Sequence, residues 1–280
     1  MTTDWLTGNK NVLVLFSVIL LRYLILAAIA FLLYYVVKKR NWFFKKIQQR
    51  FPLRKDYLRE IVFSVITTFI FTFIGYIVFI SPLSRFTQAY YDIHAHSIVY
   101  FIGTIFLMIL IHDTYFYWTH RWMHSKYIFP WFHKVHHLST NPSPWAAFAF
   151  HPLEAVIEGS VIAVFAFLFP VHPLAIGIFL LFMMAYNVYG HLGYELYPKG
   201  FSKSVVGKWI NTSINHNMHH QHFHGNYGLY FLWWDRWMGT IQPGYDERFE
   251  EVKSRTDQTA TSLSNTRSAG LGTVNTSRTL

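Results

Sequence analysis

The segment IVYFIGTIFLMILIHDTYFYWTHRWMH, residues 98–124, decides the architecture of this 280-residue chain. It begins as apolar sequence and ends with three histidines, His112, His120 and His124. A helix of these 27 residues is about 40 Å long, which exceeds the ~30 Å hydrocarbon core of a membrane. We therefore expect a helix that crosses the membrane and presents its histidines where it emerges.

The composition of the whole chain also indicates a membrane protein. Hydrophobic residues make up 52% of it and charged residues only 14%, whereas soluble domains carry about 25% charged residues. The absence of cysteine excludes disulfides, thiolate metal sites and iron–sulfur clusters. Nine basic residues fall between Lys38 and Arg59, directly after an apolar run. This placement favours contact with anionic lipid head groups, and no motif indicates a nucleic-acid partner.

Four further apolar segments, residues 11–37, 61–80, 155–169 and 174–189, predict an all-α integral membrane helical bundle. We expect about four or five membrane-embedded helices, namely three spans plus a short hairpin, with a cytosolic histidine-rich helical cap. The break PVHP separates the two hairpin arms, which either dip partway into the membrane or cross it as a pair. Arg22 lies inside the first span, where we expect its side chain to be buried, paired or snorkelling to the surface.

The distribution of positive charge orients these spans. The basic loop that follows the first span should be cytosolic, whereas residues 81–97 contain only Arg85 as a basic residue and should face outward. The alternation of spans then brings all the histidine clusters to the cytosolic side. Three histidines fall on the opposite side, where we interpret them as ordinary polar residues: His94, His96 and His172.

Three histidine clusters stand out, HRWMH at 120–124, HKVHH at 133–137 and HNMHH at 216–220. The last two share the offsets i, i+3 and i+4, which place three imidazoles on one helix face, close enough to share a metal ion or to bridge two. Neutral imidazole is a good ligand for iron, zinc and copper. Because one ion seldom uses more than about six ligands, the clustered histidines indicate two metal ions. Structural zinc usually involves cysteine, which is absent.

Other side chains are candidates for the same site. His151 and His191 flank the hairpin at the expected mouth of the site and are further candidate ligands. His222 and His224 depart from the helical offsets and are left out, while His112 stays open. A ligating histidine usually donates its other N–H to an acceptor, and four carboxylates are candidates for this role: Asp113, Glu154, Glu195 and Asp235.

The motifs HDTYFYWTHRWMH, FHKVHH, AFAFHPLE, NHNMHH and NYGLYFLWWDRWMGT together resemble the fatty acid hydroxylase / sterol desaturase superfamily, and most of all its C-5 sterol desaturase-like branch. The resemblance covers about residues 98–240. It implies a set of metal ligands, with no catalytic residue beyond them and no residues for another cofactor: His120, His124, His133, His136, His137, His151, His191, His216, His219 and His220.

The same resemblance implies an O2-dependent diiron enzyme that hydroxylates or desaturates a C–H bond of a lipid, such as a sterol, a fatty acyl chain or a related isoprenoid or ether lipid. Two iron ions are the implied cofactors, and zinc can substitute in purified samples. Members of the superfamily reside in bacterial cytoplasmic membranes or the endoplasmic reticulum. The chain has no dinucleotide motif and no haem motif of the cytochrome b5 type, so a separate cytochrome b5-type or ferredoxin-type electron donor is expected.

These expectations divide the chain into three parts. Residues 1–97 form N-terminal membrane spans with the basic cytosolic loop, residues 98–250 a histidine-box catalytic domain with the hairpin, and residues 251–280 a disordered polar tail. Two other functions stay open, a metal-ion transporter and a haem-binding electron carrier. A transporter should hold its ligands at mid-membrane on facing helices, and a haem carrier should use single histidines on paired helices.

Aromatic residues crowd the sequence around the histidine clusters, especially residues 115–118 and 227–234. Such residues commonly anchor a protein at the head-group level of a membrane. An alternative hypothesis is that some of them line a slot for lateral entry of a lipid, between the helix at 98–124 and the hairpin at 155–189.

The predicted orientation can be tested with topology reporters. A reporter fused after Arg50 should score cytosolic and one fused after Arg85 should score external, because positively charged loops are retained in the cytosol. The reverse pattern would contradict the argument that gathers the histidines on the cytosolic side.

Overall fold

Five long helices and a set of short ones make up the computed structural model, which describes residues 2–255. The long helices are α1 (Thr2–Phe31), α2 (Arg54–Phe79), α3 (Ile98–Met123), α6 (Pro152–Leu168) and α7 (Pro173–Gly190). The short ones are α4 (Phe129–Phe132), α5 (Lys134–His137), α8 (Ser213–His222), α9 (Trp233–Trp237) and α10 (Tyr245–Ser254). No strand occurs within residues 2–255, so the expected all-α class is confirmed.

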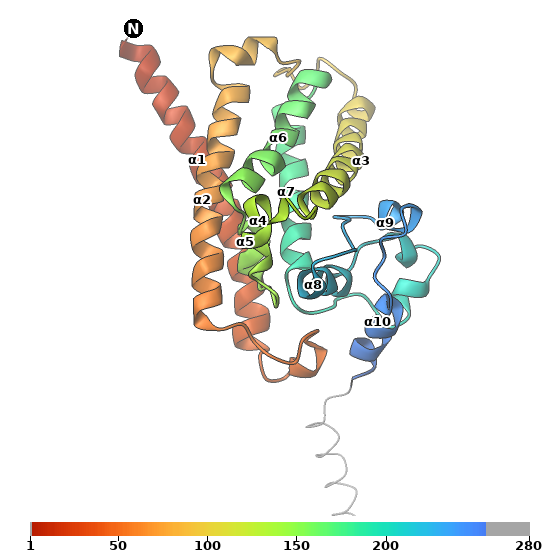
Figure 1. The fold of residues 1–280 in the computed structure, drawn as a ribbon. Helices are drawn as coiled ribbons and strands as arrows, with labels where there is room; N and C mark the ends of the chain where they lie inside the picture. Colours follow the sequence, from red (N-terminus) through yellow and green to blue (C-terminus); the bar gives the residue numbers. More distant parts are fainter. Residues whose placement is uncertain (1, 256–280) are drawn as a thin grey trace, which may run out of the picture.

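Four helical segments among the described residues are long and apolar enough to cross a membrane: Asn11–Val37, Arg54–Phe79, Ile98–Met123 and Pro173–Gly190. The first of them combines α1 with a six-residue π-helix, Leu32–Val37. The hairpin arm α6 has 17 residues against the 18 of α7. Figure 1 shows the long helices as a bundle, with α8, α9 and α10 gathered beside its lower part.

The hairpin arms begin where the sequence provides helix-start signals. His151 and His172 stand at the N-cap positions of α6 and α7, and each is followed by a proline at the first helical position. The Nδ1 atom of His172 accepts a hydrogen bond from the backbone N–H of Leu174 at 3.1 Å. Ser97 caps α3 in the same way, since its Oγ accepts from the N–H of Tyr100.

The two ends of the bundle differ in the segments that meet there. At the end that carries the histidine clusters, the basic loop packs on the cap: Ile47 N donates to Gly193 O at 2.9 Å. At the other end, Tyr90 N donates to Val171 O at 3.2 Å and joins the 81–97 loop to the hairpin break. The histidine clusters therefore share one end with the basic loop, while His172 lies at the opposite end, where its Nε2 contacts Tyr91 O.

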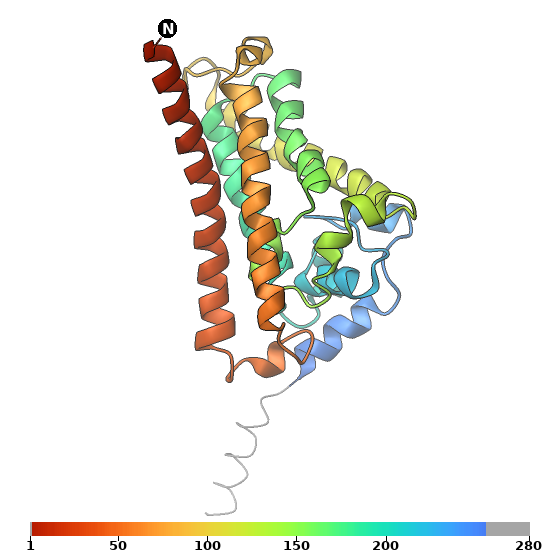
Figure 2. The same ribbon diagram turned by 60° about the vertical axis from the view of Figure 1, so that its left-hand side comes forward.

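The first two spans pack directly on the cap, as Figure 2 helps to show. The Tyr23 ring of α1 stacks on Phe148 at 5.6 Å between ring centroids. Its hydroxyl donates to the backbone oxygen of Trp145, and Ser64 of α2 donates to the same oxygen. The lower halves of α1 and α2 thus form a wall against the segment that links α5 to α6.

The C-terminal region is only partly described. The last helix, α10, ends at Ser254, so the first residues of the segment expected to be a disordered tail are helical. The rest of that predicted tail, residues 256–280, lies outside the described residues.

Contact between α2 and α6 depends on Gly159, where a Cβ atom would lie 2.6 Å from Ile74 Cδ1 and 2.9 Å from Phe71 Cδ1. The variant Gly159→Val should lower the free energy of unfolding by roughly 1–3 kcal/mol, because the overpacked helices must separate. The measurement is thermal unfolding in detergent micelles. Gly177→Val on α7 is the matched control, since nothing lies within 4 Å of a Cβ there. Equal melting temperatures for the two variants would contradict this packing.

Candidate metal centre

Nine of the predicted ligand histidines converge in two groups. The first group comprises five imidazoles whose ligand atoms lie within 4.8 Å of one another: His120, His124, His133, His137 and His219. They come from the end of α3, from the α4–α5 segment and from α8. Within the group, the Nε2 atoms of His120 and His133 lie 2.9 Å apart, and the Nε2 atoms of His137 and His219 lie 3.0 Å apart.

The second group comprises four imidazoles, all buried: His136, His191, His216 and His220. His191 follows the last residue of α7, so the hairpin delivers this ligand to the cap. The Nε2 atom of His191 lies 3.1 Å from that of His216 and 3.2 Å from that of His220. The same atom lies 3.3 Å from Nε2 of His136.

Helical geometry divides each HxxHH cluster between the two groups. With ~3.6 residues per turn, residues i and i+4 differ by about 40° around the helix, whereas i and i+3 differ by about 60° in the opposite direction. Accordingly His133 and His137 share the first group while His136 turns to the second. On α8, His216 and His220 share the second group while His219 belongs to the first.

The Nδ1 atoms of several rings are held by acceptors. Backbone oxygens accept from His120, His191 and His219, at 2.9, 2.8 and 2.7 Å respectively. A backbone carbonyl can only accept, so Nδ1 carries the proton in these rings. In a neutral imidazole the opposite nitrogen, Nε2, then presents a lone pair to the centre of its group.

Burial keeps these rings neutral. It lowers the pKa of His136, His219 and His220 well below the usual range, and that of His191 to about 4. At neutral pH the inward nitrogens are therefore unprotonated, as metal ligands must be. Two ligands at the ~2.1 Å typical of metal–imidazole bonds, meeting at a right angle, are separated by about 3.0 Å. The Nε2 spacings in both groups match this value, so the donor set fits one transition-metal ion per group.

The four candidate carboxylates have different partners. Glu154 contacts a candidate ligand directly, since its Oε1 accepts from Nδ1 of His133 at 2.6 Å. Asp113 accepts from the backbone of Tyr230 and Phe231, and Asp235 from that of Tyr227 and Gly228. Glu195 accepts from the N–H of Ile214 at the start of α8. Asp113, Asp235 and Glu195 thus hold the backbone of segments that carry candidate ligands or the hydrogen-bond acceptors of those ligands. They do not hold a candidate ligand ring.

His151 lies outside both groups, in contrast to the expectation that it is a ligand. Its Nδ1 accepts from the N–H of Leu153 at 3.3 Å and caps α6. The tripeptide His-Pro-Leu recurs at 172–174, where it starts α7 in the same way. His112 also lies outside, with its Nδ1 2.9 Å from the Tyr230 hydroxyl, and Nδ1 of His222 contacts Gln242 Oε1.

An apolar cavity of about 620 Å³ lies beside the histidine groups, between α1, α2, α6 and α7, with α3 contributing His112 and Phe116. Two of its lining rings touch the groups: Phe116 lies 4.9 Å from His120 and Phe150 lies 5.2 Å from His136, between ring centroids. The aromatic slot hypothesis placed such a space between α3 and the hairpin alone. The cavity instead uses α1 and α2 as walls, and of the aromatic residues at 115–118 and 227–234 only Phe116 lines it.

Comparisons with known proteins identify the family and the relatives that this chain resembles. Residues 105–240 match the profile of the fatty acid hydroxylase family. The chain is 33% identical over 144 residues to a Delta(7)-sterol 5(6)-desaturase of Gibberella zeae, covering 51% of this chain and 39% of that protein. It is 28% identical over 193 residues to the lathosterol oxidase of Mus musculus, covering 68% of this chain and 62% of that protein.

The chain thus spans well under two thirds of the fungal relative and just under two thirds of the mouse one. No solved structure gave a significant match. The family profile covers every predicted histidine cluster together with the hairpin between them. The part of the chain that carries the histidine clusters and the hairpin, residues 105–240, therefore matches the fatty acid hydroxylase / sterol desaturase superfamily.

Proposed function

We propose that this protein is a membrane-bound, O2-dependent diiron oxidoreductase that hydroxylates or desaturates a C–H bond of a lipid. The observation that carries the proposal is that two groups of inward-facing imidazoles lie beside an apolar, membrane-level cavity, with Phe116 and Phe150 of the cavity wall touching one group each. The relatives are named as sterol desaturases and lathosterol oxidases, which supports a lipid substrate for this chain. Two iron ions, when bound, would supply the oxidising chemistry, with electrons from a separate donor.

The chain's own residues would orient the ligands and exclude water. Five nitrogens would hold one ion and four the other. Glu154 would orient the His133 ring and increase its basicity, as a carboxylate that accepts a hydrogen bond from a metal-binding histidine does. Phe116 and Phe150 would form an apolar boundary between the cavity and the ligand rings that excludes water. The cytosolic side remains the proposed side of the site, from the charge of the adjoining loop.

The position of the ligands argues against a transporter. The two groups lie in the cap at one end of the bundle, beside the basic loop, rather than on facing helices at mid-membrane. A haem carrier would need single histidines on paired helices, whereas α5 and α8 each contribute to both groups.

Metal content tests the ligand assignment. Purified protein should hold about two transition-metal ions per chain, iron or substituted zinc, measured by elemental analysis. The variant His219→Ala should lower this to about one ion or fewer, because it removes a ligand from the first group. His151→Ala is the matched control and should keep the full content, since His151 only caps α6. Wild-type protein with less than half an equivalent of any transition metal would contradict the two-ion proposal.

Lipid analysis tests the reaction. Cells that express the protein should accumulate a lipid that has gained an oxygen atom or lost two hydrogens, as expected for oxidation of a C–H bond. Expression of His136→Ala should give no such product, whereas His94→Ala, which is altered far from the site, should give it at the wild-type level. An unchanged product level with His136→Ala would refute the assignment of the second group.

The role of Glu154 has its own prediction. Glu154→Gln should weaken metal affinity by roughly 10–100-fold, because a neutral amide orients His133 less strongly and makes it less basic. The affinity is measured by competition with a chelator of known strength. Glu247→Gln, an exposed position on α10, serves as the control. Equal affinities for the two variants would mean that Glu154 does not tune the ligand.

A further inference from the structure

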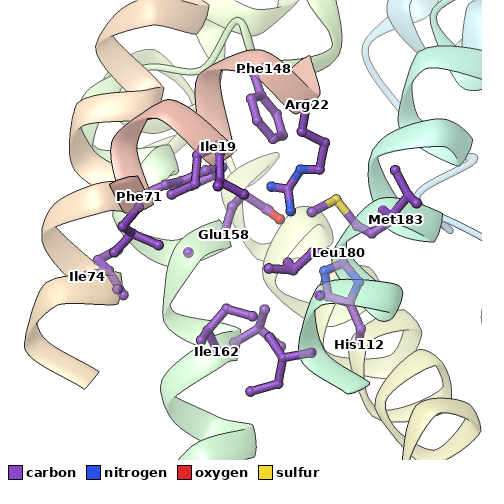
Figure 3. A pocket seen from close by; sticks show the side chains of 18 of the residues that line it. Ile19, Arg22, Phe71, Ile74, His112, Phe148, Glu158, Ile162, Leu180 and Met183 are labelled. Carbon is purple, nitrogen blue, oxygen red and sulfur yellow. The ribbon is translucent and has the colours of Figure 1, made fainter. Parts of the chain in front are cut away.

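Two side chains of ionisable type, Arg22 from α1 and Glu158 from α6, line the largely apolar cavity. Figure 3 shows the guanidinium of Arg22 and the carboxyl oxygen of Glu158 directed toward the same region of the cavity. Their neighbours along the wall are hydrocarbon, including Ile19, Phe71 and Ile162.

Neither charge has a partner in the part of the chain that the structure describes. Among the side chains described, those of residues 11–255, no ion pair within 4.0 Å and no side-chain hydrogen bond is formed by Arg22 or by Glu158, with each other or with another residue. The Nε atom of Arg22 is buried without any acceptor. The expectation that Arg22 is paired therefore does not hold within this range.

Such an arrangement is unfavourable for the protein alone. A charged group at membrane depth is costly, and a buried donor without a partner adds to that cost. An apolar side chain at either position would suit the surrounding hydrocarbon better. Unpaired ionisable groups inside a membrane protein therefore mark a functional site, and here both face a cavity of lipid-binding size.

The chemistry of the pair restricts the group that fits between them. A guanidinium only donates hydrogen bonds, and an ionised carboxylate only accepts them. A hydroxyl does both, so one hydroxyl oxygen can accept from Arg22 and donate its proton to Glu158. With Glu158 ionised, a carboxylate head group would be repelled by it, and an ammonium head group would be repelled by Arg22. An ether or ester oxygen could satisfy Arg22 only.

We propose that Arg22 and Glu158 bind the hydroxyl group of a lipid alcohol, whose hydrocarbon fills the rest of the cavity. The proposal rests on the proposed function in that the bound lipid is the substrate. Glu158 lies one helical turn beyond Glu154, which holds His133, so the hydroxyl would be bound at the side of the cavity that adjoins the first histidine group.

The test is equilibrium binding to the full-length protein in lipid nanodiscs. The probes are octadecanol and cholesterol, each compared with its own methyl ether, and octadecanoate as the anionic counterpart. On at least one of the two skeletons, the wild-type protein should bind the alcohol about tenfold more tightly than the ether, which corresponds to loss of one hydrogen bond to a charged group. No preference on either skeleton, or tighter binding of octadecanoate, would overturn the proposal.

Variants distinguish binding from a structural role. Arg22→Met and Glu158→Leu should each reduce the alcohol preference to about onefold, with an unchanged or higher melting temperature because an unpaired charge is removed. Leu180→Met, at an apolar position of the same cavity, should leave the preference intact. A lower melting temperature with the preference unchanged would assign the two charges to folding instead and refute the proposal.

If either apolar variant fails to fold, Arg22→Lys and Glu158→Gln replace them, and the preference must still fall because the geometry or the charge of the hydrogen bond is lost. Binding needs neither metal nor turnover. Iron-loaded protein that prefers the alcohol but forms no oxidised lipid would therefore reject the oxidation and keep the hydroxyl site. Protein that oxidises a lipid but shows no preference for the alcohol would reject the hydroxyl site and keep the oxidation.

Discussion

Nitrogen lone pairs that face one another at about 3 Å repel unless a cation lies between them, and this constraint organises the cap. Nine rings converge in this way, eight of them buried, and the outward nitrogens of His120, His191, His219 and His133 are held by backbone oxygens or by Glu154. The loop at 223–231 supplies two of the carbonyl acceptors, those of Gly225 and Tyr227. Asp113 and Asp235 in turn hold that loop by its N–H groups. Much of the buried polar structure therefore serves the orientation of the imidazoles.

The helices and the histidine clusters could be predicted from the sequence because both depend on residue types that form apolar runs or recur at helical spacing. The first span at 11–37, the helix from residue 98 and the hairpin around residues 170–173 appear where apolar runs and prolines predict them. The position of the histidine clusters at the end of the bundle that carries the basic loop was predicted from the charges of the loops and the alternation of the membrane spans alone. The acceptors of the ligand rings were not readable, because most are backbone oxygens that any residue could provide.

His151 and the cavity show two other limits of sequence reasoning. The recurrence of His-Pro-Leu before both hairpin arms was a visible sign that His151 is a helix cap, yet its closeness to the clusters favoured a ligand. The cavity depends on which faces of α1 and α2 meet α6 and α7, and near-uniform apolar helices carry no periodic signal for that choice. Arg22 was the one conspicuous residue in the first span, and a buried pair was the ordinary interpretation.

The division of α5 and α8 between the two histidine groups has a consequence for assembly. Each of these short helices contributes to both groups, so in the proposed two-ion centre an ion captured by one group would fix the rotation of α8 that the other group also requires. Part of the ordering of the other group would then be complete, and the second ion would be held more tightly than the first. Loading would be cooperative by this linkage.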